Sequence, residues 1–168
     1  MKYAKWICVV LLISSLTSFV EKDKPTGGLN VGCIAPDFTM NAIQAEQPET
    51  DLSSLRGKRV LLSFWASYDA PSRMQNVELS NALRKADNND VEMISISFDE
   101  YASIFKETVR NDRIVAQRCL VDTKGAGSDI YKEYRLNRGF GNYLLDENGV
   151  IIAKNISAEE LNGYLTMN

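Results

Sequence analysis

The apolar run at residues 60–66, which reads VLLSFWA, constrains the fold of this chain more than any other stretch. Its short length, with Gly57 before it and Pro71 soon after it, favours a β-strand over a segment of buried helix. A strand without polar alternation is covered on both faces, as is the centre of a parallel sheet with helices packed on each side. Open sheets of this kind carry their chemistry at the carboxyl ends of the strands, so we expect any reactive group between Tyr68 and Ser72.

The sequence continues through this end of the strand as FWASYDAPSR at residues 64–73. This stretch resembles the motif F-W-A-S-W-C-x-x-C-R of thioredoxin-like proteins, most closely the exported thiol-disulfide oxidoreductases of the TlpA/ResA type, which are AhpC/TSA-like. The residues around the two motif cysteines match the motif, but Asp69 replaces the first cysteine and Ser72 replaces the second. The resemblance therefore implies a thioredoxin-like fold from which the CxxC dithiol has been lost.

Two further motifs at family spacing support this resemblance. Residues 31–38 (VGCIAPDF) are similar to the x-G-x-x-A-P-D-F segment shared by this family and the peroxiredoxins, and residues 52–58 (LSSLRGK) are similar to its L-x-x-L-x-G-K. Physically, the second is one helical turn closed by Gly57, which can take a positive φ. The fold implied is α/β: a three-layer α/β/α arrangement with a mixed central sheet and an N-terminal β-hairpin. A peroxiredoxin is the alternative, but its peroxidatic cysteine would align with Asp69.

Hydrophobic periodicity and turn residues predict the order of the other elements. We expect an N-terminal hairpin from residues 38–43 and 51–52, and a helix at 71–86 directly after the apolar strand. The later elements are expected in this order: a strand at 91–98, a helix beginning at Asp99, a strand at 119–122, a short helix within 124–134, a hairpin of 143–145 with 150–153, and a last helix whose capping box pairs Ser157 with Glu160.

The N-terminus has the layout of a secretory signal peptide. Lys2 and Lys5 precede an apolar stretch at residues 6–16, which small polar residues follow, and this stretch is too short for a comfortable membrane span. The alternative is an uncleaved N-terminal anchor. Export to the periplasm or cell envelope implies an oxidising compartment, where a disulfide can persist. We assign residues 1–20 to a signal peptide, 21–30 to a linker and 31–168 to a thioredoxin-like domain.

Composition excludes several classes of function. The net charge of −3 and the lack of a polybasic run give no support for binding to nucleic acid or to an anionic membrane, so we expect membrane contact only through an uncleaved N-terminal segment. The chain has no histidine, which excludes Ser–His and Cys–His nucleophilic pairs and imidazole metal ligands. Its three cysteines cannot form a disulfide framework or a four-thiolate zinc site. We therefore expect neither a metal nor another cofactor.

The residues at the motif do not support the chemistry of the family. Thiol–disulfide exchange needs a thiolate to attack sulfur and a second thiol to resolve the mixed disulfide, and neither Asp69 nor Ser72 supplies one. Asp69 is instead predicted to cap the helix that follows, and Pro71 suits the first turn of that helix. The cis-proline of the family falls on Phe140, because residues 143–146 (YLLD) resemble its T-F-L-I-D strand. A cis bond before a residue other than proline costs about 2.5–4 kcal/mol, so we predict a trans bond there.

Two cysteines remain after the predicted signal peptide, Cys33 and Cys119. Three interpretations are open for them: buried free thiols, a structural disulfide, or a relocated redox pair. The spacing of the two residues does not separate these interpretations, because disulfide geometry is decided in space.

Aromatic residues are expected around the former active site, and the predicted binding cleft consists of Trp65, Tyr68, Pro71, Phe140 and Tyr143. Such a cleft is either filled by its own side chains or kept as an apolar patch for an envelope protein or peptide. The sequence thus predicts a binding or accessory protein without classical disulfide reductase activity. One alternative is an atypical thiol-disulfide oxidoreductase that uses Cys33 and Cys119, and another is a scaffold subunit of an envelope assembly.

Overall fold

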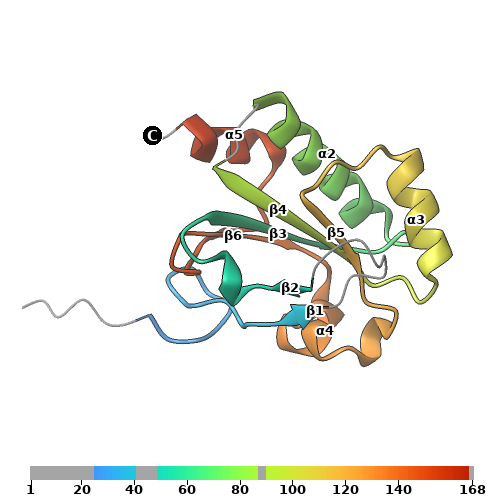
Figure 1. Ribbon diagram of the computed structural model, residues 1–168, viewed down its shortest axis with the longest axis horizontal. Coiled ribbons are helices and arrows are strands. Elements are labelled where there is room, and N and C mark those ends of the chain that lie inside the picture. Colours follow the sequence, from blue (N-terminus) through green and yellow to red (C-terminus); the bar gives the residue numbers. More distant parts are fainter. Residues whose placement is uncertain (1–24, 41–48, 87–89, 167–168) are drawn as a thin grey trace, which may run out of the picture.

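The computed structural model describes residues 25–40, 49–86 and 90–166 of the chain. Its centre is a five-stranded mixed sheet in the order β5-β4-β3-β6-β7 (Figure 1). The central strand pairs in parallel with β4 and antiparallel with β6, and all of its residues except the first are buried. The predicted central strand is thereby confirmed. The strands are β3 (Arg59–Trp65), β4 (Val91–Ser97), β5 (Arg118–Val121), β6 (Asn142–Leu145) and β7 (Ile151–Lys154).

Two layers cover the faces of this sheet, as Figure 1 shows. One layer consists of three helices: α2 (Ala70–Ala86), α3 (Ala102–Asn111) and α5 (Ala158–Thr166). The other is built from short pieces: the hairpin of β1 (Thr39–Met40) and β2 (Thr50–Asp51), the helix α4 (Asp129–Glu133), and the 3₁₀ turns η1 (Ser53–Leu55), η2 (Gly125–Gly127) and η3 (Leu136–Arg138). The predicted three-layer α/β/α arrangement and the N-terminal hairpin are confirmed; residues 41–43 of the predicted first strand lie outside the described residues.

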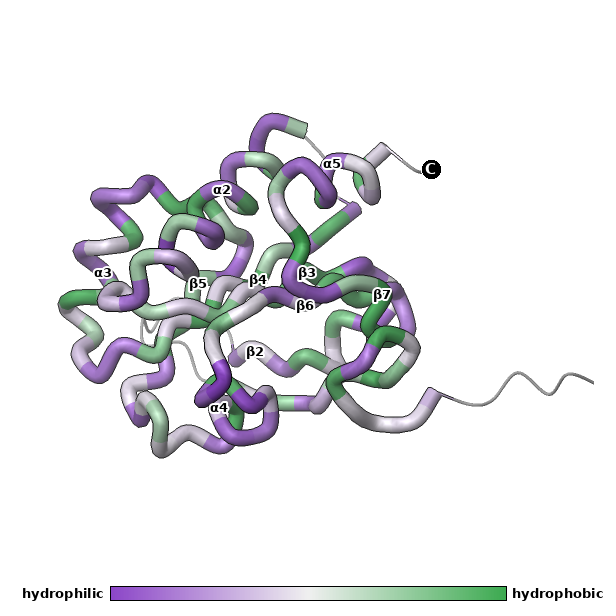
Figure 2. The backbone as a smooth tube through the Cα atoms, turned by 180° about the vertical axis from the view of Figure 1, so that it is seen from behind, coloured by the Kyte–Doolittle hydropathy of each residue, from purple (hydrophilic) through white to green (hydrophobic). Residues whose placement is uncertain are grey.

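Side chains of β3 alternate between the two layers because successive residues of a strand point to opposite faces. Leu61 packs with residues of α2 and α5, whereas Leu62 and Phe64 belong to the cluster on the α4 side. The outer helices α2 and α3 mix hydrophilic and hydrophobic residues along their length, as expected for helices with one face in solvent (Figure 2).

The starts of α5 and α3 test two of the predicted helix boundaries. At α5 the predicted capping box is present: Ser157 N donates to Glu160 Oε2 at 2.7 Å, and Glu160 N donates to Ser157 Oγ at 3.2 Å. The prediction for α3 is wrong at its start, because the helix begins at Ala102 rather than at Asp99. Asp99 is instead buried and bonded to the loop after β3, as described below.

The end of the predicted linker is part of the folded domain. Gly28 N donates to Ile34 O at 3.0 Å, Ile34 N donates to Thr26 O at 2.9 Å, and Lys154 Nζ donates to Leu29 O at 3.4 Å. Backbone hydrogen bonds therefore hold Thr26 and Gly28 against Ile34, and the Lys154 side chain joins Leu29 to β7. The predicted signal peptide and residues 21–24 of the linker lie outside the described residues. In the part of the chain that is described, no helix has both the length and the apolar character that a membrane crossing requires.

Candidate functional site

Asp69 lies where β3 ends and α2 begins, at the position of the first motif cysteine. Its Oδ2 accepts a hydrogen bond from Ser72 N at 3.1 Å. Its backbone oxygen accepts one from Ser72 Oγ at 3.1 Å and another from Arg73 N at 3.0 Å. Both motif side chains are thus used to satisfy the start of the helix, and the predicted capping role of Asp69 is confirmed.

A buried carboxylate holds the loop in front of this helix. Asp99 is only 3% exposed, and its Oδ1 accepts hydrogen bonds from Ser67 N at 3.0 Å and Ser67 Oγ at 2.6 Å. Its Oδ2 accepts a third from Ser97 Oγ at 2.7 Å. This role of Asp99 could not be predicted from the sequence, because Asp99 and Ser67 are far apart in the chain and meet only when β3 and β4 pair.

Arg73, the residue after the motif, connects α2 to the end of α3. Its guanidinium donates to both carboxylate oxygens of Asp112, with Nη2 at 2.7 Å from Oδ1. These hydrogen bonds hold the pKa of Asp112 below its usual value, against the opposing effect of partial burial. The first turn of α2 is therefore fixed at both of its ends, by Asp99 through the preceding loop and by Asp112 through Arg73.

Phe140 is the residue that the sequence resemblance places at the family's cis-proline. The described residues contain no cis peptide bond, so the predicted trans bond before Phe140 is confirmed. The ring stacks on Phe98 with centroids 6.0 Å apart and planes 21° apart, and it meets the rings of Tyr131 at 6.2 Å and Tyr68 at 6.4 Å edge-on. An aromatic cluster thus fills the space in front of the capped helix.

The structure brings together only some residues of the predicted binding cleft. Tyr68 is 71% exposed beside Phe140, Pro71 is also exposed, and Phe140 and Tyr143 are half-buried. Trp65 does not belong to this surface. It is fully buried on the other side of the sheet, where its Nε1 donates to Ser95 Oγ at 2.9 Å. The prediction failed for Trp65 because an apolar strand covered on both faces gives no pattern that assigns each side chain to a face.

Phe140 and Tyr143 line one side of a cavity of about 440 Å³, which we call the basic cavity. Its basic residues are Arg135, Arg138 and Lys154, which lie at the end of α4, in η3 and at the end of β7. The sequence analysis missed all three. The only signal available was the regular spacing of Lys132, Arg135 and Arg138 along the chain.

Cys33 and Cys119 are free and lie at opposite edges of the sheet. Ile151 N of β7 donates to Cys33 O at 2.8 Å, whereas Cys119 belongs to β5. Four strand spacings of about 4.8 Å separate β7 from β5, far beyond the roughly 7 Å between Cα atoms that a disulfide allows. Of the three interpretations, free thiols are confirmed, with both cysteines half-buried, whereas this separation excludes a disulfide or a redox pair between them. Burial also raises the pKa of the Cys119 thiol, which disfavours the reactive thiolate.

The described residues contain no group of three or more histidine, cysteine, aspartate or glutamate side chains placed to hold a metal ion.

The sheet order and the helix that starts at the end of the central strand define a thioredoxin-like protein. The chain is similar to the solved structure of a thioredoxin-like protein from Parabacteroides distasonis ATCC 8503, with a TM-score of 0.72 and 39% identity over 84% of this chain and 98% of that one. It is 27% identical to the thioredoxin-like protein YneN of Bacillus subtilis (88% of this chain, 86% of the relative). It is 25% identical to the thiol-disulfide oxidoreductase ResA of Bacillus cereus (88% and 81%). The AhpC/TSA family profile matches residues 31–154, and the chain belongs to the AhpC/TSA family.

Proposed function

We propose that this chain is an exported thioredoxin-like protein that binds a protein or peptide partner of the cell envelope and does not carry out thiol–disulfide exchange. The observation that carries the proposal is the start of α2, where Asp69 and Ser72 complete the helix cap. Exchange at this position requires a thiolate as the attacking group and a second thiol to release the product. A carboxylate and a hydroxyl cannot replace them.

The positions of the remaining described cysteines support the same conclusion. Cys33 and Cys119 lie at opposite edges of the sheet, so one thiol cannot resolve a mixed disulfide formed at the other. The raised pKa of Cys119 further lowers its fraction of thiolate near neutral pH.

The loop at Phe140 supports a role in binding a partner through aromatic side chains. Phe140 packs between Phe98, Tyr131 and Tyr68, and Tyr68 presents most of its surface to solvent. Exposed tyrosines contribute a large apolar area together with a hydroxyl, and they are enriched at protein interfaces.

Insulin reduction in the presence of dithiothreitol tests the proposal. We expect the purified chain to precipitate insulin no faster than dithiothreitol alone, and the Cys119→Ser variant to behave identically. Catalysis that Cys119→Ser abolishes would contradict the proposal.

A variant with Asp69→Cys and Ser72→Cys serves as the positive control for the placement of the motif. Its two thiols should form a disulfide with oxidised glutathione, which accepts the two electrons and two protons and leaves as two molecules of glutathione. We expect this variant to turn over insulin poorly, because Phe140 replaces proline beside the restored pair. If no disulfide forms, Asp69 and Ser72 do not occupy the positions of the motif cysteines.

A further inference from the structure

The basic cavity combines three cationic side chains with neutral ones and has no carboxylate in its lining. Arg135, Arg138 and Lys154 are joined there by the amide side chains of Asn30, Gln75 and Asn155. The chain as a whole has more acidic than basic residues, with a net charge of −3. A wall of one charge sign in an acidic protein attracts a ligand of the opposite sign.

Among the described residues, the three cations of the basic cavity also have no acidic partner in an ion pair. The ion pairs among the described residues are Lys58–Glu92, Arg118–Glu92, Arg73–Asp112 and Lys132–Asp129. Lys154 Nζ reaches only the backbone oxygen of Leu29, at 3.4 Å. Arg73 and Arg118 are half-buried and each bind a carboxylate, and half-buried Arg59 donates to the backbone oxygen of Tyr164. Arg135 and Arg138 are instead exposed, and neither is part of an ion pair among the described residues.

The two arginines also face a second hollow. Arg135 and Arg138 border this hollow of about 490 Å³, which has no carboxylate in its lining. Lys132 lines it as well, but its charge is paired with Asp129. The segment around α4 is largely hydrophilic along the backbone (Figure 2).

One wall of the basic cavity is aromatic. Phe140 and Tyr143 are both half-buried and both line it. Burial raises the pKa of the Tyr143 phenol, and the charge of Arg135 partly offsets this rise. The cavity volume of about 440 Å³ lies within the range of small-molecule sites, roughly 300–1,000 Å³.

We propose that the basic cavity binds a small organic anion. Arg135, Arg138 and Lys154 hold its carboxylate or phosphate group, and its apolar part lies against Phe140 and Tyr143. Arginine suits both acids, because its planar guanidinium can donate two parallel hydrogen bonds to either. This site goes beyond the proposed function and does not depend on it, since it requires neither the redox motif nor the exposed Tyr68.

Titration of the full chain, followed by the chemical shifts of its amide groups, tests the site. The probes are phenyl phosphate, phenylacetate, inorganic phosphate and neutral phenylacetamide. We expect saturable shifts at Gly139, Gly141 and Asn155 with the two aromatic acids, weaker binding of inorganic phosphate, and no saturation with phenylacetamide. The affinities of phenyl phosphate and phenylacetate then distinguish a phosphate site from a carboxylate site.

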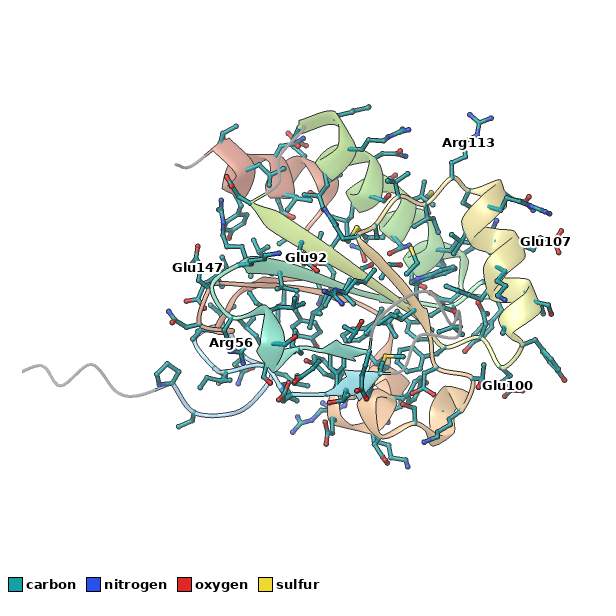
Figure 3. The ribbon with its side chains drawn as sticks, viewed as in Figure 1. Arg56, Glu92, Glu100, Glu107, Arg113 and Glu147 are labelled. Atoms are coloured by element: carbon teal, nitrogen blue, oxygen red, sulfur yellow. The ribbon has the colours of Figure 1, made fainter. Side chains whose placement is uncertain are left out.

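Arg113→Gln is a matched control for Arg135→Gln. Both arginines directly follow a helix C-cap, both are exposed, and both have a left-handed backbone, with φ of 53° at Arg113 and 54° at Arg135. Arg113 points away from the body of the molecule at the end of α3 (Figure 3) and does not line the basic cavity. The two variants therefore lose the same charge from the same backbone geometry.

We expect Arg135→Gln and Arg138→Gln each to weaken binding of the aromatic acid by about tenfold or more, and Arg113→Gln to leave it unchanged. Arg138 does not have a left-handed backbone conformation. The Arg138→Gln variant therefore tests the site even if the Arg135→Gln variant folds poorly. Three results would overturn the proposal: no saturable shift with any anion, equal binding of phenylacetamide, or equal weakening by Arg113→Gln.

Discussion

At the scale of single residues, the side chains at the start of α2 have a structural task. The Asp69 carboxylate accepts a hydrogen bond from Ser72 N at this end of the helix, where the positive end of the dipole would lower the pKa of a thiol. A carboxylate oxygen thus satisfies an amide group at the helix start and stabilises it.

Replacing Asp69 tests this structural task. We expect Asp69→Ala to lower the free energy of unfolding by about 0.5–2 kcal/mol, because Ser72 N loses its acceptor. Asp69→Asn keeps an oxygen at the same place and should cost much less. Equilibrium unfolding in urea measures both variants. If the asparagine variant loses as much stability as the alanine variant, the hydrogen bond to Ser72 is not what stabilises the helix start.

Residue roles could be predicted from the sequence where the partners are close along the chain. The cap at Asp69 and the capping box of Ser157 and Glu160 each span three residues, so their patterns are visible in the sequence. The role of Asp99 was not predictable in this way. An acidic residue shortly before a helical pattern is typical of a helix start, and only the pairing of β3 with β4 directs this carboxylate to Ser67 instead.

At the scale of the elements, ion pairs fix helices and strands to one another. Arg73 and Asp112 join the first turn of α2 to the end of α3. Glu92 of β4 accepts hydrogen bonds from Arg118 of β5 and from Lys58, which precedes β3. Burial alone would raise the pKa of Glu92, but these hydrogen bonds and charges outweigh it and lower the pKa below its usual value.

These lowered pKa values give the stability a defined dependence on pH. Because the folded-state pKa of Asp112 lies below its unfolded value of about 3.9, its ion pair stabilises the fold fully above that pH and is lost as the pH falls through the folded-state pKa. Glu92 acts in the same direction. We therefore expect the free energy of unfolding to decrease from about pH 5 downward, and to do so less steeply in Asp112→Asn.

Asp129→Asn is the control for this experiment, because it removes an exposed ion pair with Lys132 and should change stability by less than about 1 kcal/mol. Urea unfolding at pH 3.5, 5 and 7 measures how steeply the free energy of unfolding of each variant changes with pH. An Asp112→Asn variant with the slope of the unmodified chain would show that the pair with Arg73 does not contribute.

At the scale of the whole molecule, three motifs at the right spacing were enough to predict the fold, whereas the basic cavity was not predictable. The motifs surround the central strand and each is continuous in the chain. The cavity instead draws residues from α2, from the segment after α4 and from the end of β7. These residues are far apart in the chain and come close together only in the completed fold, so no local sequence pattern reveals the cavity.

The exposed side of the aromatic cluster is the surface on which a partner is expected. A photoreactive phenylalanine placed at Tyr68 should therefore form a covalent adduct with an envelope protein or peptide in cells. The same residue placed at Val115 is the control, because Val115 is also an exposed apolar side chain (53%, against 71% for Tyr68) and lies before β5. Equal yields of adduct at the two positions would count against a partner at this surface.

The order of the strands has a consequence for the synthesis of the protein. The central strand β3 receives one of its two neighbours, β6, only after residues 142–145 have left the ribosome. Until then, one side of an almost wholly apolar strand has unsatisfied backbone groups, and strands in that state associate readily with other chains. A strand that is made after β4 and β5 therefore protects the first strand of the five-stranded sheet from aggregation.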